Sequence, residues 1–178
     1  KPVRIKTKES TDDRYLYIED LAGLIAGVQM STLEFHIWGS LRNRLDRPDR
    51  VVFDLDPGEG IGWREVVEAA VHIRGELQAL GLVPFVKTTG GKGIHVVVPV
   101  TPKLAWKKFH QAIGDIAVQI AAREPQTFTT TMGKDNRKRL IFIDFHRNAR
   151  SATAAAPYSL RARTNLPAST PVGWNDLE

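Results

Sequence analysis

The feature that most constrains the fold is a glycine loop between two short runs of strand-forming residues. Residues 84–88 and 94–98 are rich in β-branched and aromatic side chains, and only the segment TGGKG, residues 89–93, separates them. A link this short joins neighbouring strands as an antiparallel hairpin, because a parallel connection needs a crossover of about a dozen residues. We therefore predict an α+β fold with a mixed or antiparallel sheet flanked by helices.

Other segments supply the helices and strands around this hairpin. Apolar residues recur at helical spacing in three segments, residues 18–33, 62–80 and 104–123. Two short apolar runs have the composition of strands, residues 51–56 and 140–144. Gly81 directly follows the second helical segment, as expected at a helix C-terminus. A chain of 178 residues is long enough for one domain with a hydrophobic core, so we expect a single domain over residues 1–178.

The composition excludes several classes of protein. The chain has no cysteine, which rules out disulfides, thiolate zinc sites, iron–sulfur clusters and cysteine nucleophiles. Any metal must therefore be held by oxygen or imidazole. No stretch approaches the roughly 18 to 20 unbroken apolar residues of a bilayer span, and residues 1–10 lack the apolar region of a signal peptide. We expect a soluble, cytoplasmic protein without a membrane partner.

The positive charge of the chain is concentrated in one segment. The net charge is +5, yet residues 134–163, called the basic segment below, hold eight basic against two acidic residues. Residues 1–50 are nearly balanced, with nine basic and eight acidic residues. Aromatic and histidine side chains interleave the basic segment: Phe142, Phe145, His146 and Tyr158. This mixture is typical of a phosphate-contacting surface, and a solvated charged face would have the same composition.

Three aspartates near strand ends predict a metal site. Asp54 and Asp56 share one face of a strand, roughly 7 Å apart at two residues of strand rise, while Phe53 and Leu55 point to the other face. Asp144 ends another apolar strand in the same way. A single such aspartate is commonly a turn or cap residue, but together these like charges become favourable when a hard cation such as Mg²⁺ or Mn²⁺ bridges them.

The glycine loop could bind an anion. Its glycines let backbone N–H groups approach a phosphate, and Lys92 adds a positive charge. It is not a P-loop, because the spacing differs and a strand follows in place of a helix. A plain hairpin turn would explain the same residues, and His95 could be a hydrogen-bonded core histidine.

Several long strings resemble one family. FDLDPGEG, KTTGGKGIHVVVP and RLIFIDFHRNARSATAAAPYSLRAR, with EFHIW and DRPDRVVFDLDP, are similar to the polymerase domain of bacterial DNA ligase D. The resemblance runs from about Tyr15 to the C-terminus. This domain belongs to the archaeo-eukaryotic primase superfamily, so the resemblance implies a primase-like catalytic core. It also implies association with the nucleoid.

The resemblance implies a role for individual residues. Asp54, Asp56 and Asp144 match family carboxylates that hold two divalent cations, Mn²⁺ or Mg²⁺. Thr89, Lys92 and His95 match a motif that contacts the phosphates and sugar of the incoming nucleotide. Arg137 and Arg161 match basic residues that bind the triphosphate, and His36 matches an active-site histidine.

The implied reaction is nucleotide addition to a DNA primer during double-strand-break end joining. Its partners would be DNA with recessed or gapped ends, nucleoside triphosphates, a ligase and an end-binding protein. The family domain extends further N-terminally, where it contacts a 5′-phosphate and the template, so we expect weaker DNA binding here. Thr89 departs from the usual serine but keeps a hydroxyl. Two alternatives stay open: metal-dependent phosphodiester hydrolysis, and a non-catalytic module that binds DNA or a partner.

Overall fold

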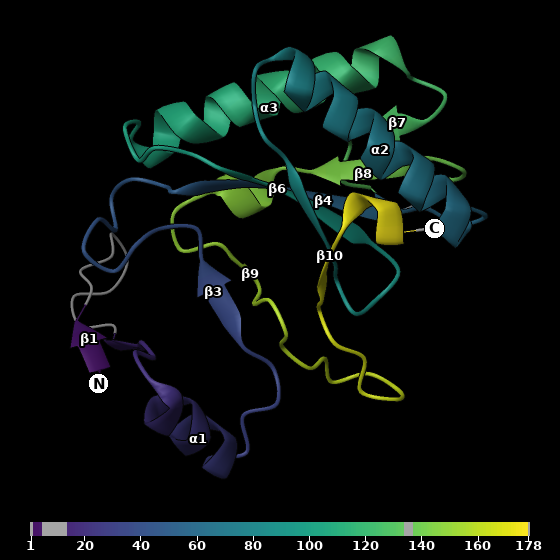
Figure 1. The fold of residues 1–178 in the computed structure, drawn as a ribbon. Helices are drawn as coiled ribbons and strands as arrows, with labels where there is room; N and C mark the ends of the chain where they lie inside the picture. Colours follow the sequence, from purple (N-terminus) through teal and green to yellow (C-terminus); the bar gives the residue numbers. More distant parts are fainter. Residues whose placement is uncertain (1, 5–13, 134–136, 178) are drawn as a thin grey trace. The chain divides into compact units, whose positions relative to one another are not determined.

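The computed structural model describes residues 2–4, 14–133 and 137–177 (Figure 1). The chain groups into two compact units, Lys1–Leu33 and Glu34–Glu178. The single domain over residues 1–178 therefore stays a prediction. Residues 134–136, at the start of the basic segment, lie outside the described residues.

The first unit contains a two-stranded antiparallel sheet and one helix, namely β1 (Pro2–Arg4), β2 (Arg14–Leu16) and α1 (Leu21–Gln29). The Asp20 side chain caps α1 by accepting a hydrogen bond of 2.8 Å from the backbone N–H of Gly23. The predicted helix within residues 18–33 is confirmed, with a start fixed by this cap.

Six strands of the second unit form one sheet in the order β10–β5–β6–β4–β8–β7. Their bounds are Arg50–Pro57 (β4), Phe85–Thr88 (β5), Ile94–Pro99 (β6), Phe128–Thr129 (β7), Ile141–Asp144 (β8) and Pro171–Val172 (β10). Neighbours pair antiparallel except β7 and β8, which are parallel. The sheet is thus mixed, and the predicted hairpin of β5 and β6 is confirmed.

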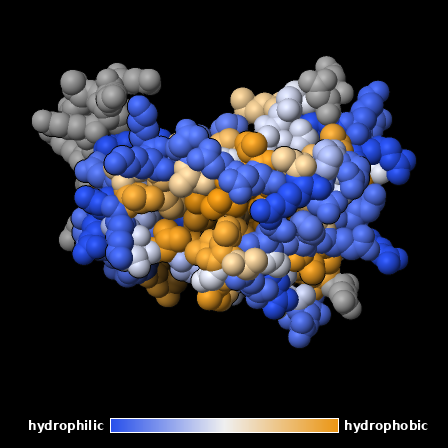
Figure 2. Space-filling view, turned by 90° about the horizontal axis from the view of Figure 1, so that it is seen from above, coloured by the Kyte–Doolittle hydropathy of each residue, from blue (hydrophilic) through white to orange (hydrophobic). Residues whose placement is uncertain are grey.

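Two helices, α2 (Trp63–Ala79) and α3 (Trp106–Arg123), cover one face of this sheet (Figure 1). As predicted, α2 stops at a glycine: the backbone N–H of Gly81 donates to the carbonyl of Gln78 at 2.9 Å. Viewed from above the helices, hydrophilic residues predominate at the rim and hydrophobic residues gather in the middle (Figure 2). Among the described residues, no helix is long and apolar enough to cross a membrane.

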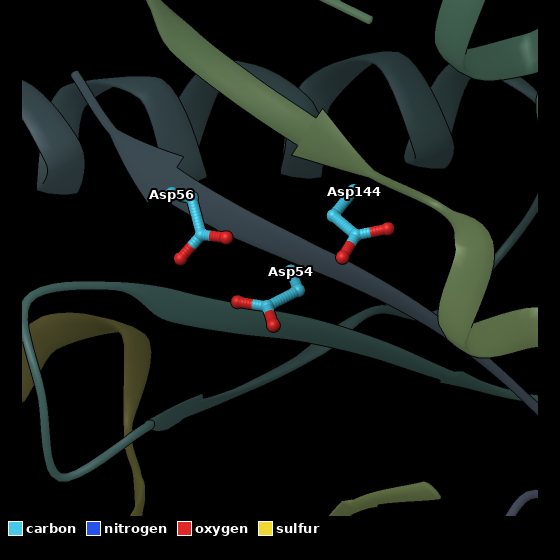
Figure 3. Close-up of side chains that lie close together, drawn as sticks. All are labelled: Asp54, Asp56 and Asp144. Atoms are coloured by element: carbon cyan, nitrogen blue, oxygen red, sulfur yellow. The ribbon is translucent and has the colours of Figure 1, made fainter. Parts of the chain in front are cut away.

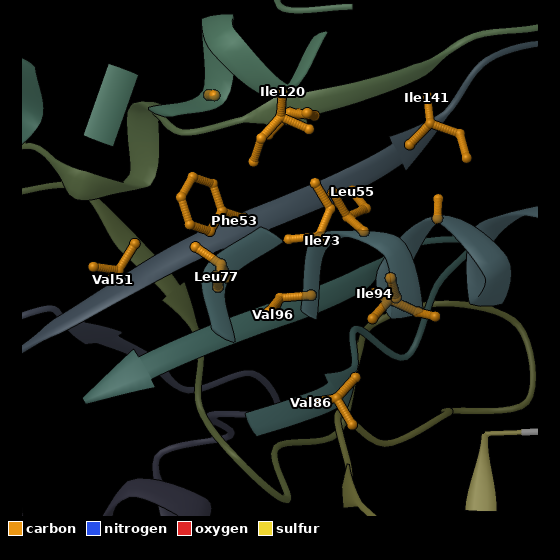
Figure 4. Packing of buried hydrophobic residues seen from close by; sticks show 14 of the residues in the cluster. Val51, Phe53, Leu55, Ile73, Leu77, Val86, Ile94, Val96, Ile120 and Ile141 are labelled. Atoms are coloured by element: carbon orange, nitrogen blue, oxygen red, sulfur yellow. The ribbon is translucent and has the colours of Figure 1, made fainter. Parts of the chain in front are cut away.

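The hydrophobic core lies between the sheet and these helices (Figure 4). Side chains alternate along β4, so Phe53 and Leu55 are fully buried in this core. Burying side chains of this size stabilises the fold by about 1.5–3 kcal/mol each. The same alternation turns Asp54 and Asp56 to the opposite face of the sheet, as predicted.

A second small sheet and two short helices complete this unit: β3 (His36–Trp38), β9 (Thr153–Ala155), η2 (His146–Asn148) and η3 (Trp174–Asp176). The side-chain amide of the buried Asn148 makes the hydrogen bonds to the backbone of β4 that a neighbouring strand would otherwise make. Its Oδ1 accepts the N–H of Val52 at 2.8 Å, and its Nδ2 donates to the Val52 carbonyl at 2.7 Å. These bonds fix η2 next to the sheet just beyond the end of β8.

Candidate metal and nucleotide site

Four polar residues form one row across the sheet, on the face away from the helices. In the strand register, Lys87 of β5 faces His95 of β6, His95 faces Asp54 of β4, and Asp54 faces Asp144 of β8. Directly opposed residues of antiparallel strands bring their Cβ atoms to about 4.5–5.5 Å. The row therefore gathers residues that lie up to 90 positions apart in sequence.

The three predicted aspartates come together at this row (Figure 3). Asp54, Asp56 and Asp144 each offer one carboxylate oxygen, and these oxygens lie within 4.8 Å of one another. These oxygens are thus closer together than the strand spacing of about 7 Å suggested. Asp54 is only 6% exposed, and its Oδ1 has no hydrogen-bond partner among the described residues. A buried oxygen in this state is costly unless a cation binds it.

The carboxylates differ in their acidity. Burial opposes ionisation of Asp54, but the hydrogen bond and charge of His95 outweigh it and hold the Asp54 pKa below its usual value. For Asp56, burial and then the neighbouring charges of Asp54 and Asp144 raise the pKa to about 6. A cation would reverse this effect, because it favours the ionised form of each carboxylate.

His95 is buried and faces the acidic cluster. Its Nε2 lies 3.2 Å from Oδ2 of Asp54, and the side chain is 4% exposed. Its Nδ1 is buried without a hydrogen-bond partner among the described residues. His95 is thus a bonded internal histidine that also orients a predicted metal ligand.

The glycine loop is closed by its own threonine. Thr89 Oγ1 donates to the carbonyl of Gly93 at 3.0 Å and accepts the N–H of Gly91 at 3.2 Å. Gly90 has a φ of +67°, and a Cβ on Gly93 would lie 2.6 Å from the Leu55 carbonyl oxygen. The hairpin therefore accounts for two of the glycines. Lys92 is exposed, and its side chain makes no hydrogen bond or ion pair within the described residues.

A second cluster holds this loop. Nε of Arg161 donates to Oε1 of Glu34 at 2.8 Å, and its Nη1 donates to the carbonyl of Thr89. Nε2 of His36 lies 3.6 Å from the same Glu34 oxygen. The hydrogen bond from Arg161 is the main cause that lowers the pKa of Glu34. The predicted residues Arg161 and His36 are thus joined through Glu34, which the sequence did not single out as a site residue, and Arg161 bonds directly to Thr89.

Arg137 lies beside the acidic cluster. Its Nε and Nη2 donate to the carbonyls of Thr131 and Met132 at 3.2 and 2.8 Å. Its guanidinium lies 3.7 Å from the ring centroid of Phe142, which pairs with Asp56 in the strand register. This places one predicted arginine next to the row of carboxylates.

The comparison with known proteins decides the family. The family model described as "LigD, primase-polymerase domain" matches residues 1–178. The chain belongs to this family. The resemblance seen in the sequence, and with it the primase-like fold, is thereby confirmed.

Individual relatives agree with this assignment. The multifunctional non-homologous end joining protein LigD of Pseudomonas aeruginosa is 39% identical over 163 residues, covering 92% of this chain and 19% of that protein. Its Mycobacterium tuberculosis counterpart, named a DNA repair protein, is 34% identical over 172 residues, covering 92% and 23%. The chain therefore spans about a fifth of the length of these relatives. A solved polymerase domain from M. tuberculosis ligase D in complex with DNA matches with a TM-score of 0.91 and 30% identity, over 99% of this chain and 64% of that one.

Two residues that lie beside the candidate site of this LigD primase-polymerase domain were not predicted from the sequence. Nε of Arg147 lies 3.5 Å from Oδ2 of Asp54 and 3.6 Å from Oδ2 of Asp144, so this arginine pairs with two of the three aspartates. Lys87 is 6% exposed and donates to Oγ of Ser169 at 2.6 Å. Burial lowers the Lys87 pKa to about 8. Arg147 follows Asp144 by three residues, and this spacing was a usable sequence signal for its place beside the carboxylates. No such signal marked Lys87.

An apolar cavity of about 170 Å³ adjoins the site of this LigD primase-polymerase domain. Its floor includes Val52 and Val97, which lie on the same sheet face as the carboxylates. Trp38 of β3 and Ala154 of β9 contribute to its walls. The sheet face thus continues from a charged row into an apolar recess, with Arg147 among the residues at their junction.

Proposed function

We propose that this chain adds ribonucleotides or deoxyribonucleotides to the 3′-hydroxyl of a DNA primer during double-strand-break end joining. The hydroxyl would attack the α-phosphorus of a nucleoside triphosphate, and pyrophosphate would leave. The observation that carries this proposal is the convergence of three carboxylates, with oxygens within 4.8 Å, in a chain of the LigD primase-polymerase family.

Asp54, Asp56 and Asp144 would hold two divalent cations, Mn²⁺ or Mg²⁺. The donor set supports this, since hard cations prefer carboxylate oxygens, and so does the buried Oδ1 of Asp54 that lacks a partner among the described residues. When bound, such cations lower the pKa of an attacking hydroxyl and stabilise charge on a phosphoryl leaving group.

The neighbouring residues would orient these ligands. His95 holds Oδ2 of Asp54 at 3.2 Å, while Oδ1 has no hydrogen-bond partner among the described residues and would be available to a cation. The backbone N–H of His146 donates to Oδ1 of Asp144 at 2.8 Å and fixes that carboxylate at the start of η2. Both contacts limit the motion of a metal ligand, which is how outer residues tune a metal site.

Three basic residues would bind the triphosphate. Lys92 is exposed and has no competing hydrogen bond or ion pair within the described residues. Arg137 uses Nε and Nη2 internally, and Arg161 uses Nε and Nη1, so each keeps one guanidinium nitrogen for a phosphate oxygen. Charge-assisted bonds of this kind would stabilise the departing pyrophosphate. Thr89 and His36, held in the same cluster, would contact the nucleotide beside them.

The DNA partner would have a recessed or gapped end. The solved relative is a polymerase domain in complex with DNA, and the curated relatives are named for end joining. By extension, we propose that this chain works with a ligase and an end-binding protein at the nucleoid.

The test is primer extension on a gapped duplex with Mn²⁺ and each class of nucleoside triphosphate. The wild type should extend the primer, and Asp144→Asn should slow extension by at least about 100-fold, since a metal ligand contributes several kcal/mol. Asp115→Asn is the matched control, because Asp115 is a carboxylate of α3 that accepts a bond from Gln111 at 2.8 Å. Equal rates for all three proteins would contradict the metal site.

Two other outcomes would replace the proposal. Release of nucleotides from the DNA without addition would indicate a phosphodiesterase. DNA binding that ignores both metal and nucleotide would indicate a non-catalytic module.

A further inference from the structure

Two loops come together at the N-terminal end of β4 and form a strongly basic surface. Residues 41–50 lead into β4, and residues 101–108 lead into α3. Together with Arg150, these two segments contain eight basic and two acidic residues. Five exposed cations define what we call the basic loop surface: Arg44, Arg47, Lys103, Lys107 and Lys108.

The two loops are bonded to each other. Nε1 of the buried Trp106 donates to the carbonyl of Leu45 at 2.8 Å, and the N–H of Val100 donates to the carbonyl of Asp49 at 2.9 Å. The Arg47 side chain also bonds to the carbonyl of Lys103. A polar depression lined by both loops lies between them. The cations are therefore presented by a pre-formed scaffold.

The acidic residues of this region are already neutralised. Oδ1 of Asp46 accepts from Arg150 at 2.6 Å, and Asp49 binds Arg50 at 2.7 and 3.0 Å. In the part of the chain that the structure describes, none of the five cations of the basic loop surface pairs with a carboxylate. Their positive charge is left for an external anion.

Helix stability does not explain two of these cations. Lys107 and Lys108 lie in the first turn of α3, which has no acidic residue, and the cap residue Ala105 makes no side-chain hydrogen bond. Positive charges at this end of a helix oppose its dipole. A bound phosphate would relieve that repulsion.

We propose that the basic loop surface binds the phosphate backbone of duplex DNA, away from the point of nucleotide addition. This inference rests on the proposed function for its DNA partner. Arg50, where β4 begins, is four residues from Asp54, or roughly 13 Å at about 3.3 Å per residue. That distance corresponds to about four base pairs at 3.4 Å per pair. A duplex arm must therefore extend beyond about four base pairs to reach the surface.

Duplex DNA fits the surface better than an acidic protein segment. The cations come from two bonded loops and a helix start, and a duplex offers phosphates at regular spacing along a rigid rod. Two of the cations are arginines, whose planar guanidinium groups bind phosphate through paired hydrogen bonds.

The test measures fluorescence anisotropy of the full chain with gapped DNA whose duplex arms are four or twelve base pairs long. Arg44→Glu and Lys107→Glu are the test variants, since neither side chain makes a hydrogen bond or ion pair within the described residues. Arg64→Glu is the matched control: Arg64 is equally basic and 92% exposed, but lies on α2, where it pairs with Glu68. Thermal unfolding verifies that each variant is folded.

We expect the wild type to bind the longer arm at least tenfold more tightly at low salt. Each test variant should bind the DNA with long arms three- to tenfold more weakly than the wild type does, and should bind the DNA with short arms as tightly as the wild type. The slope of log affinity against log salt should fall by about 0.9 for each phosphate that the variant no longer neutralises. Arg64→Glu should behave as the wild type. Equal losses for both arms, or for the control, would overturn the inference.

Two further outcomes separate DNA binding at this surface from binding of an acidic protein and from nucleotide addition. If polyglutamate competes as well as duplex DNA at equal charge, and the variants weaken both alike, the surface binds acidic protein and the inference is wrong. If the wild type shows the arm-length effect but adds no nucleotide, the inference stands and the proposed function fails.

Discussion

The basic segment and the basic loop surface differ in how they use their positive charge. In the basic segment, four arginines bond to other groups of the protein: Arg137, Arg147, Arg150 and Arg161. In the basic loop surface, all five cations are exposed and none pairs with a carboxylate among the described residues. The density of charge along the sequence therefore does not reveal which cations are available to an external anion.

The two regions should respond differently to mutation. An arginine that joins distant parts of the fold stabilises it, whereas an exposed cation without a partner contributes little to stability and remains free to bind. The effects below are ordered from the largest to the smallest expected change in the free energy of unfolding.

Arg161→Ala should cost the most stability. Its side chain is 15% exposed and joins Glu34 to the carbonyl of Thr89. Loss of these charge-assisted bonds should lower the free energy of unfolding by about 2 kcal/mol, measured by urea denaturation. Arg44→Ala is the matched control and should stay within about 0.5 kcal/mol of the wild type. Equal losses for the two variants would remove the distinction between the regions.

Arg147→Ala should destabilise the metal-free protein by about 1 kcal/mol, because the half-exposed guanidinium lies near the carboxylates of both Asp54 and Asp144. The loss should shrink when Mn²⁺ is added, since a bound cation takes over the neutralisation. The measurement compares urea unfolding in chelator and in Mn²⁺. A loss that is the same in both conditions would show that Arg147 does not act as a counter-ion of the acidic cluster.

Asp56→Asn should stabilise the metal-free protein in a pH-dependent way. The pKa of Asp56 is raised to about 6 in the folded state from 3.8, so the folded protein binds this proton more tightly than the unfolded chain. The stability that Asp56 supplies is complete below about pH 4 and is lost as the pH rises to about 6. After allowance for solvent screening, the variant should gain about 1 kcal/mol over the wild type at pH 8 and almost nothing at pH 4. A gain that is constant across this pH range would contradict the shifted pKa.

Lys107→Glu should produce the smallest change, and of opposite sign to the first two variants. An acidic residue in the first turn of α3 interacts favourably with the helix dipole, so stability should rise by about 0.5 kcal/mol. The same substitution should weaken binding to a long duplex arm. A thermal melt beside the anisotropy assay tests both effects, and a loss of stability would show that Lys107 supports the fold.

Local features of the sequence predicted much of the fold. The segments assigned to α1, α2, α3, β4, β5, β6 and β8 are confirmed within a few residues at their ends. The prediction that Asp54 and Asp56 point to one face of the strand, and Phe53 and Leu55 to the other, is likewise confirmed. It could be made from the sequence because side-chain alternation depends only on the strand itself. The shorter strands β1, β2, β3, β7, β9 and β10 were not predicted, since two or three residues carry no periodic signal.

The sequence by itself determined the family, the α+β class, the hairpin and the three carboxylates that the structure gathers, whereas the parallel pair of β7 and β8 that makes the sheet mixed was seen only in the structure. The roles of Asp54, His95, Arg137 and the other site residues in catalysis and nucleotide binding stay predictions. Only the tertiary structure decided that Lys87 and Arg147 lie beside those carboxylates, that Glu34 holds Arg161, and that two distant loops share one basic surface. These contacts depend on strand register and loop packing between residues up to 127 positions apart, and such long-range geometry leaves no periodic pattern in the local sequence.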